Sequence, residues 1–166
     1  MKIQITTLIL GILMFSPTIS NAQLLEVKQT VFGMDCSPCA HGLEKRIKKM
    51  DGIQSASVSL NNGLLTAMLK NDNMLTLKEI RNAIENSGFK AQKADIVAQG
   101  SLIKRDENSF VLKVDSGEQF LLITDDQNNL NNYLENNQLV VVFGEAEIAN
   151  ETGTKLLVKK IEKPRL

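Results

Sequence analysis

Cys36 and Cys39 are the only two cysteines among the 166 residues of this chain. Their type and their spacing suit them to bind a metal ion or to take part in redox reactions. They lie in the run Gly-Met-Asp-Cys-Ser-Pro-Cys-Ala, residues 33–40, between an apolar stretch and a helical pattern. Such a pair can capture a thiophilic metal ion or exchange with disulfides, and the spacing alone fits both. As a disulfide it would close only a tiny loop, so a role in stability is the weakest explanation.

The position of the pair at the start of a helix favours its thiolate form. Ser37 is the expected N-cap and Pro38 the expected first helical residue. Cys39 would then lie in the first turn, where unpaired backbone N–H groups and the helix dipole favour a negative sulfur. Cys36, in the preceding loop, can turn its sulfur toward the same ion. Two thiolates suit soft ions that accept few ligands, such as Cu(I), Ag(I) or Hg(II), whereas Zn(II) would need further ligands.

The elements expected around this pair have a β-α-β-β-α-β order, the split βαβ arrangement of ferredoxin-like domains. Alternating or periodic apolar residues predict strands over 27–32, 56–60, 64–70 and 89–94, a helix that follows Pro38, and a second helix that begins at the capping box of residues 76–79. Asn61-Asn62-Gly63 predicts the tight turn between the two middle strands.

From about Ile96 the pattern changes to closely spaced strands. These are expected over 97–104, 110–114, 120–123, 139–148 and 155–161, with a short helix around Leu130 and Leu134 and a bend at Gly144. Three strands, a helix and two strands fit a small closed barrel of the oligonucleotide/oligosaccharide-binding (OB) type. The predicted fold class is therefore α+β, with a ferredoxin-like domain over 23–95 and an OB-like barrel over 96–166.

The first 22 residues have the pattern of a signal peptide. Lys2 supplies a positive start, residues 8–15 are a short apolar core, and small residues precede a cleavage point after Ala22. We therefore expect a periplasmic or secreted protein whose mature chain does not span a membrane. The 19 Lys and Arg residues balance 19 Asp and Glu residues, so nothing in the charge suggests a nucleic acid partner.

The run from Gly33 to Ala40 resembles the GMxCxxC loop of heavy-metal-associated domains. Residues 50–53 (Met-Asp-Gly-Ile) and 84–89 (Ile-Glu-Asn-Ser-Gly-Phe) also resemble conserved segments of that family. The resemblance covers roughly residues 24–95. It implies that Cys36 and Cys39 are metal ligands, that Met34 is a buried loop anchor, and that Phe89 is a hydrophobic neighbour of the site. It also implies a metal-transporting membrane protein, a P-type ATPase or a mercury-type permease, as the partner.

The identity of the single bound ion is left open between two groups. The family resemblance and the two thiolates favour Cu(I) or Hg(II). Asp35 stands where copper and mercury versions usually have Thr, and a carboxylate there would favour Zn(II) or Cd(II). Asp35 could equally point to solvent. His41 lies two positions beyond Cys39, about 200° around the helix axis, and is expected to face away from the site.

Two other functions compete with metal binding. Cys-Ser-Pro-Cys resembles the Cys-Gly-Pro-Cys of thioredoxin-type thiol–disulfide oxidoreductases. The three prolines, Pro17, Pro38 and Pro164, leave none to form the cis-Pro loop of that family, and the β-β-α-β continuation is also wrong for it. The chain could instead be a binding module in which the C-terminal half does the main work. We favour a non-enzymatic metal-binding protein.

Overall fold

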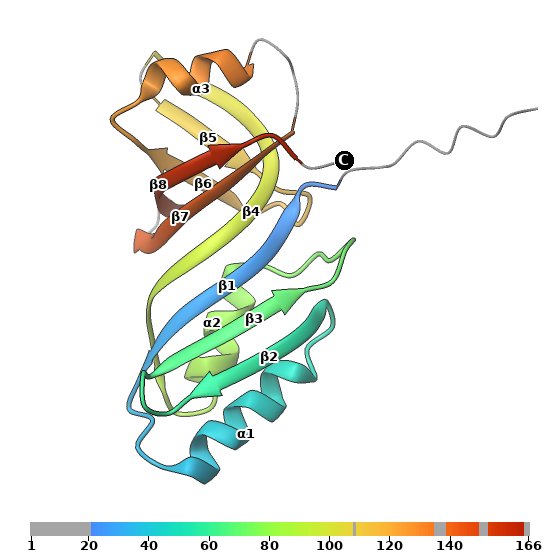
Figure 1. Ribbon diagram of the computed structural model, residues 1–166, viewed down its shortest axis with the longest axis vertical. Coiled ribbons are helices and arrows are strands. Elements are labelled where there is room, and N and C mark those ends of the chain that lie inside the picture. The colour runs from blue at the N-terminus through green and yellow to red at the C-terminus, as the bar shows by residue number, and fades with distance from the viewer. Residues whose placement is uncertain (1–20, 108, 135–138, 150–152, 165–166) are drawn as a thin grey trace, which may run out of the picture.

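One long strand, β4 (Lys90–Asp106), runs through both halves of the protein and joins them (Figure 1). The computed structural model describes residues 21–107, 109–134, 139–149 and 153–164. The other elements are β1 (Gln23–Phe32), α1 (Ser37–Lys48), β2 (Ile53–Ser59), β3 (Leu64–Leu69), α2 (Leu77–Glu85), β5 (Ser109–Lys113), β6 (Gln119–Ile123), α3 (Gln127–Leu134), β7 (Leu139–Ala149) and β8 (Gly153–Glu162).

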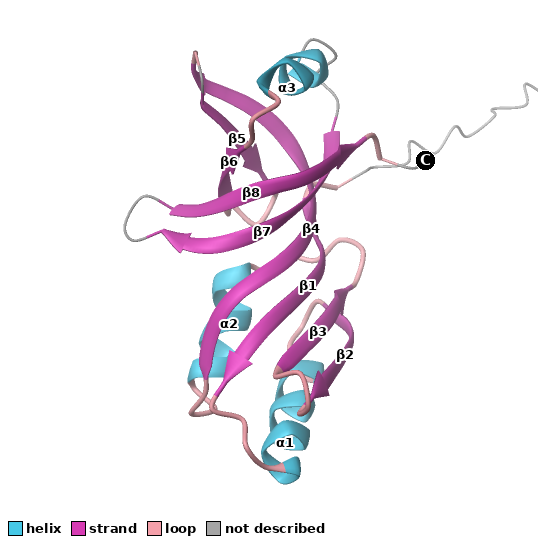
Figure 2. Cartoon of the chain, turned by 60° about the vertical axis from the view of Figure 1, so that its left-hand side comes forward, coloured by secondary structure: helices cyan, strands magenta, loops and turns pink. Residues whose placement is uncertain are grey.

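The first half has the predicted β-α-β-β-α-β order. Its strands pair antiparallel in the order β2-β3-β1-β4, and α1 and α2 contact each other as well as the strands that they cover (Figure 2). The apolar faces of both helices are buried, with Leu43 and Ile47 on α1 and Ile80 and Ile84 on α2 at most 1% exposed. The capping box at the start of α2 is confirmed, because Thr76 and Glu79 bond each other's backbone N–H groups.

The second half is a ring of strand pairings that begins and ends on β4. β4 pairs with β5, β5 with β6, β6 with β8, β8 with β7, and β7 again with β4. Only the β6–β8 pairing in this ring is parallel, and α3 lies between β6 and β7 in the sequence. The predicted succession of three strands, a helix and two strands is therefore confirmed in the described residues.

The strands predicted over 89–94 and 97–104 are not separate. Burial alternates without a break through Ala94, Ile96 and Ala98, and the whole segment is one strand. The predicted domain boundary between residues 95 and 96 therefore lies inside β4, with no linker. From Ala94 to Ser101, β4 pairs with β7. The first half thus continues directly into the sheet of the second half.

Gly144 allows two strands to approach closely at this junction. A Cβ atom there would lie 2.6 Å from the backbone oxygen of Leu157, on the neighbouring strand β8. The β7–β8 register shifts between Phe143 and Gly144, at the glycine where the sequence predicted a bend. A side chain at this position would have to displace the β8 backbone.

Two polar contacts attach α2 to the second half. The Glu118 carboxylate, in the turn from β5 to β6, accepts a hydrogen bond of 2.8 Å from the Leu77 N–H at the start of α2. Burial raises the pKa of Glu118, while its bonds with the Leu77 and Lys78 N–H groups partly offset that rise. Arg81, only 6% exposed, donates to the Gln29 side chain at 3.1 Å and to the Ala146 carbonyl of β7 at 3.1 Å. Burial lowers the pKa of Arg81.

The residues next to the predicted cleavage point are part of the described fold. Ala22 is 5% exposed, its N–H donates to the Asp115 carboxylate at 2.9 Å, and its carbonyl accepts from the Asp115 N–H at 2.7 Å. The signal peptide predicted over residues 1–22 otherwise lies outside the described residues, so export and cleavage after Ala22 stay predictions.

Candidate metal centre

Cys36 and Cys39 lie at the free end of the first half, where the loop after β1 enters α1 (Figure 1). Cys36, not Ser37, is the N-cap: its backbone is extended (φ −137°, ψ 145°) and its Sγ accepts a hydrogen bond from the Cys39 N–H at 3.1 Å. The predicted N-cap is wrong by one residue, because a cysteine sulfur here takes the place of the expected hydroxyl. Pro38, predicted to be the first helical residue, is therefore the second residue of α1 and still lies in its first turn.

The two sulfurs are bonded to each other in this structure. Cys36 and Cys39 form a disulfide, with their Cα atoms 5.1 Å apart, and both residues are only half-buried. The backbone therefore holds the two side chains close enough to share one ion. A thiolate, not a disulfide sulfur, is the metal ligand, so the pair must be reduced before it can bind.

The family resemblance implies that Met34 is buried and that Phe89 lies beside the cysteine pair, and the structure agrees with both expectations. Met34 is 6% exposed and belongs to the core, as expected of a loop anchor. Phe89 and Cys39 line the same hollow of about 440 Å³, together with Leu43. The cysteine pair thus lies beside a surface hollow with apolar side chains on one side, and Cys39 remains accessible to an incoming group.

A clasp between the two helices borders this hollow, and the sequence reasoning missed it. The Arg46 guanidinium donates through Nη1 to the Asn86 carbonyl at 3.0 Å and to the Ser87 hydroxyl at 3.1 Å. The Ser87 hydroxyl in turn donates to the Ala83 carbonyl at 2.7 Å. The clasp fixes the end of α2, and hence the chain that leads to Phe89, against α1.

Neither candidate third ligand joins the cysteine pair. Asp35 and His41 are both exposed, which His41 was predicted to be. Throughout the described ranges, no group of three or more His, Cys, Asp or Glu side chains could hold a metal ion. This part of the chain therefore supplies two sulfurs, a set that suits ions of low coordination number.

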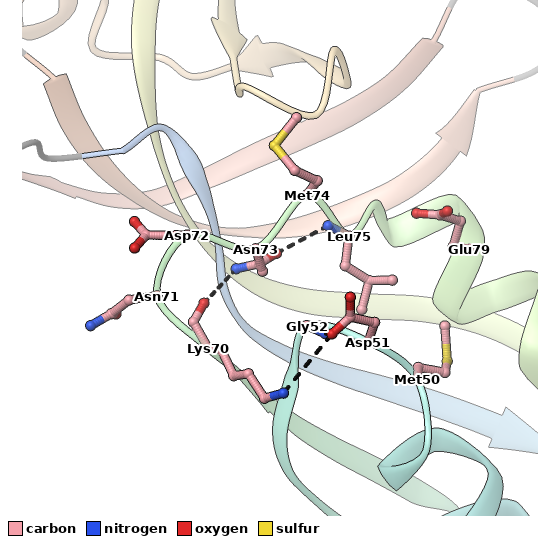
Figure 3. A pocket seen from close by; sticks show the side chains of 10 residues that line it. All are labelled: Met50, Asp51, Gly52, Lys70, Asn71, Asp72, Asn73, Met74, Leu75 and Glu79. Atoms are coloured by element: carbon pink, nitrogen blue, oxygen red, sulfur yellow. Dashed lines mark hydrogen bonds and ion pairs between the residues drawn. The ribbon is translucent and has the colours of Figure 1, made fainter.

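A larger hollow, of about 520 Å³, lies between the end of α1 and the loop from β3 to α2 (Figure 3). The side chains of Met50 and Met74 reach it from different sides and their thioethers do not converge. Asn73, which is 5% exposed, instead ties the loop together through the Lys70 carbonyl at 2.8 Å and the Leu75 N–H at 3.2 Å. The hollow does not assemble a second soft-metal site.

Comparison with known proteins agrees with this geometry. The profile of the heavy-metal-associated domain matches residues 29–90. The copper chaperone CopZ of Staphylococcus saprophyticus is 34% identical over 59 residues, which are 36% of this chain and 85% of the chaperone. The chain belongs to the heavy-metal-associated domain family.

A further relative of this heavy-metal-associated domain is part of a much longer protein, and a similar solved structure is a small domain by itself. Human copper-transporting ATPase 2 is 41% identical over 61 residues, which are 37% of this chain but 4% of the ATPase. A solved structure titled CopZ metallochaperone is 27% identical and covers 40% of this chain and 97% of its own, with a TM-score of 0.38. The residues that match the family profile, 29–90, lie in the first half of the chain, so the family describes that half alone.

The family and the fold together favour metal binding over thiol–disulfide exchange. The β-α-β-β-α-β order of the first half belongs to heavy-metal-associated domains and departs from the thioredoxin-type continuation after the first helix. Among the helices of the described segments, none has the length and apolar composition needed to cross a bilayer.

Proposed function

We propose that this protein is an exported, non-enzymatic carrier that holds one soft metal ion between the thiolates of Cys36 and Cys39. The observation that carries the proposal is the placement of two adjacent sulfurs on an accessible loop at the start of α1, in a domain of the heavy-metal-associated family. The carrier would buffer the ion or pass it to a metal-transporting membrane protein, by analogy with the named copper relatives.

Cu(I) is the ion that the site suits best, with Hg(II) next. The described residues hold no group of three or more His, Cys, Asp or Glu side chains that could bind a metal, which leaves the two thiolates, and Cu(I) and Hg(II) accept such a low coordination number. Zn(II) or Cd(II) would need the Asp35 carboxylate or an outside ligand to complete its shell. The copper named in the relatives' titles points the same way.

Transfer would proceed by exchange of thiolate ligands. An incoming cysteine of the acceptor approaches the exposed rim, joins the two sulfurs on the ion, and then replaces first one and then the other. No bond of the protein chain changes, and the ion keeps at least two sulfur ligands throughout. The partly open hollow beside Cys39 gives the incoming sulfur a path.

Reduction controls this activity. The disulfide seen here has no thiolate to offer, so two electrons and two protons from a thiol donor must convert it to the dithiol before metal binds. In an oxidising compartment, bound metal and the disulfide are therefore alternative states of the same pair.

A competition titration of reduced protein with Cu(I), Hg(II) and Zn(II) tests the proposal. The parent chain should bind one Cu(I), and the double variant Cys36→Ser/Cys39→Ser should lose that binding. His41→Ala is the matched control, because His41 lies on the same helix and is exposed. Retention of tight Cu(I) binding by the double variant would end the proposal.

Two finer assignments are also proposals. In the second half, β4, β5, β6, β8 and β7 pair in a ring, and α3 lies between β6 and β7 in the sequence. Both features support an OB-like barrel for this half. The pattern of residues 1–22 supports export and cleavage near Ala22, which would place the mature protein in the periplasm or outside the cell.

A further inference from the structure

The ring of the second half has an apolar outer face. Phe110, Leu112 and Leu122 are at most 5% exposed and fill the inside of the ring. Because side chains alternate along a strand, the residues between them point outward. The strand registers align these outward residues on four neighbouring strands, β4, β5, β6 and β8. The outer face consists of Ile103, Val111, Leu121, Ile123 and Leu157.

Three of the five side chains of the outer face are exposed, whereas Val111, which lies between Ile103 and Leu121, is only 7% exposed. Ile103 is 43% exposed, Ile123 is 42% and Leu157 is 50%. They are half of the large exposed apolar side chains found among the described residues, and the registers pair Ile123 directly with Leu157. Contiguous exposed apolar residues rimmed by polar ones mark a contact surface. The five residues include no aromatic ring on which a nucleic acid base could stack.

Opposite charges flank the outer face at its two ends. The turn from β4 to β5 and the end of β6 lie at one end, with Asp106, Glu107 and Asp125. Arg105 offsets one of these carboxylates. Lys113, at the end of β5, and Lys155, at the start of β8, lie toward the other end, where Glu147 of β7 is the cross-strand neighbour of Lys155 and offsets one of the two positive charges. Within the part of the chain that the structure describes, neither lysine and none of the three carboxylates forms an ion pair.

We propose that the outer face joins two copies of this chain in a twofold-symmetric dimer. A twofold axis that lies between the two sheets and runs across their strands reverses the strand direction of the second copy. It therefore sets apolar residues against apolar residues and the lysine end of one copy against the carboxylate end of the other. A surface that is complementary to itself in this way is what an isologous interface requires. Face-to-face packing of sheets is an established way to bury such side chains.

The dimer is compatible with metal transfer. The loop of Cys36 and Cys39 lies at the end of the molecule opposite the ring (Figure 1). Both metal sites of a dimer would thus remain exposed, and each could meet an acceptor. The dimer does not depend on the proposed function, because none of its contacts involves the cysteine pair.

Sedimentation velocity over a protein range up to about 100 µM, which reveals even weak association, tests the proposal. The parent should form a dimer as concentration rises, and Leu157→Glu should weaken that dimer by at least about tenfold. Met74→Glu is the matched control, because Met74 is 62% exposed but lies in the first half, and it should dimerise like the parent. A parent that stays monomeric, or association that Leu157→Glu leaves unchanged, would overturn the proposal.

A charge exchange tests the orientation of the two copies. Lys113→Glu places carboxylates against the Glu107 end of the partner and should weaken the dimer. Combined with Glu107→Lys it restores the opposite charges and should recover most of the lost affinity. Circular dichroism and the urea unfolding midpoint report whether each variant is folded. If folded Lys113→Glu dimerises as the parent does, or the double variant recovers nothing, the twofold arrangement is wrong.

Discussion

The Glu118 carboxylate offers a sharp test of how the two halves are joined, since it accepts hydrogen bonds from the first turn of α2. Glu118→Ala leaves the Leu77 N–H without its acceptor, and a buried N–H left unsatisfied costs about 1–3 kcal/mol. Loss of a negative charge at a helix N-terminus adds roughly 0.3–1 kcal/mol. Glu118→Ala also removes the cost of burying a charged carboxylate, and this gain offsets part of the two losses. We therefore expect the free energy of unfolding to fall by about 2 kcal/mol.

Glu118→Gln is the matched variant, because its amide oxygen can still accept from the Leu77 N–H but carries no charge. We expect it to lie within about 1 kcal/mol of the parent at neutral pH, since the lost dipole interaction and the avoided burial of charge oppose each other. Urea unfolding of the parent and both variants, followed by circular dichroism, measures these differences. If both variants lose equal stability, the hydrogen bond is not the source of the effect.

The pH dependence gives an independent check on the burial of Glu118. Burial raises the pKa of Glu118 above its unfolded value, so the folded state favours the protonated acid. Its contribution to stability is fully present below the unfolded pKa and is lost as pH rises through the folded pKa. The stability of the parent relative to Glu118→Gln should therefore fall as pH rises through that interval and then level off. A relative stability that rises with pH would refute the reasoning.

Four further predictions follow from single features of the structure. Arg81→Met should lower the free energy of unfolding by about 2–4 kcal/mol, measured in urea, because it leaves buried acceptors unpaired; an unchanged midpoint would contradict this. Gly144→Ala should cost more than about 1 kcal/mol by thermal unfolding, since its Cβ would lie 2.6 Å from the Leu157 oxygen. Because the exposed Asp35 does not join the cysteine pair, Asp35→Thr should leave the affinities for Zn(II) and Cu(I) within about twofold of the parent in competition titrations, and a selective loss of Zn(II) binding would show that Asp35 is a ligand. Mass spectrometry of the exported protein should find Gln23 as its first residue, and retention of Ala22 would refute the predicted cleavage point.

Most elements of the fold could be predicted because their signals are local in the sequence. The capping box at Thr76 and the apolar stripe through Ile80 and Ile84 place α2 without any knowledge of its neighbours. The continuity of β4 could not be found in this way. Asp95 interrupts the apolar residues of that strand, and only pairing with β1 and β7 on its two sides shows that the chain does not turn there.

The buried polar contacts were beyond prediction for a related reason. Arg81 and Glu118 look like ordinary surface charges in the sequence, and nothing near either one indicates burial. Their partners come from distant parts of the chain, the Ala146 carbonyl for Arg81 and the Leu77 N–H for Glu118. Such contacts exist only after the second half has folded against α2.

The cysteine site could be predicted in its residues but not in its details. The GMxCxxC run led to the pair and to its neighbour Phe89, which the structure places at the same hollow as Cys39. The cap formed by the Cys36 sulfur and the clasp from Arg46 were missed. A sulfur is a rare N-cap, and the partners of Arg46 lie about 40 residues further along the chain, at the end of α2.

X-ray absorption spectroscopy at the copper edge, on reduced protein loaded with one equivalent of Cu(I), would identify the ligand atoms of the bound ion directly. We predict a first shell made of sulfur alone, with two ligands from the chain, and a shell of different composition when Cys36 and Cys39 are both replaced by serine. A parent spectrum dominated by nitrogen or oxygen, or one that the double replacement leaves unchanged, would contradict the assignment of this pair as the metal site.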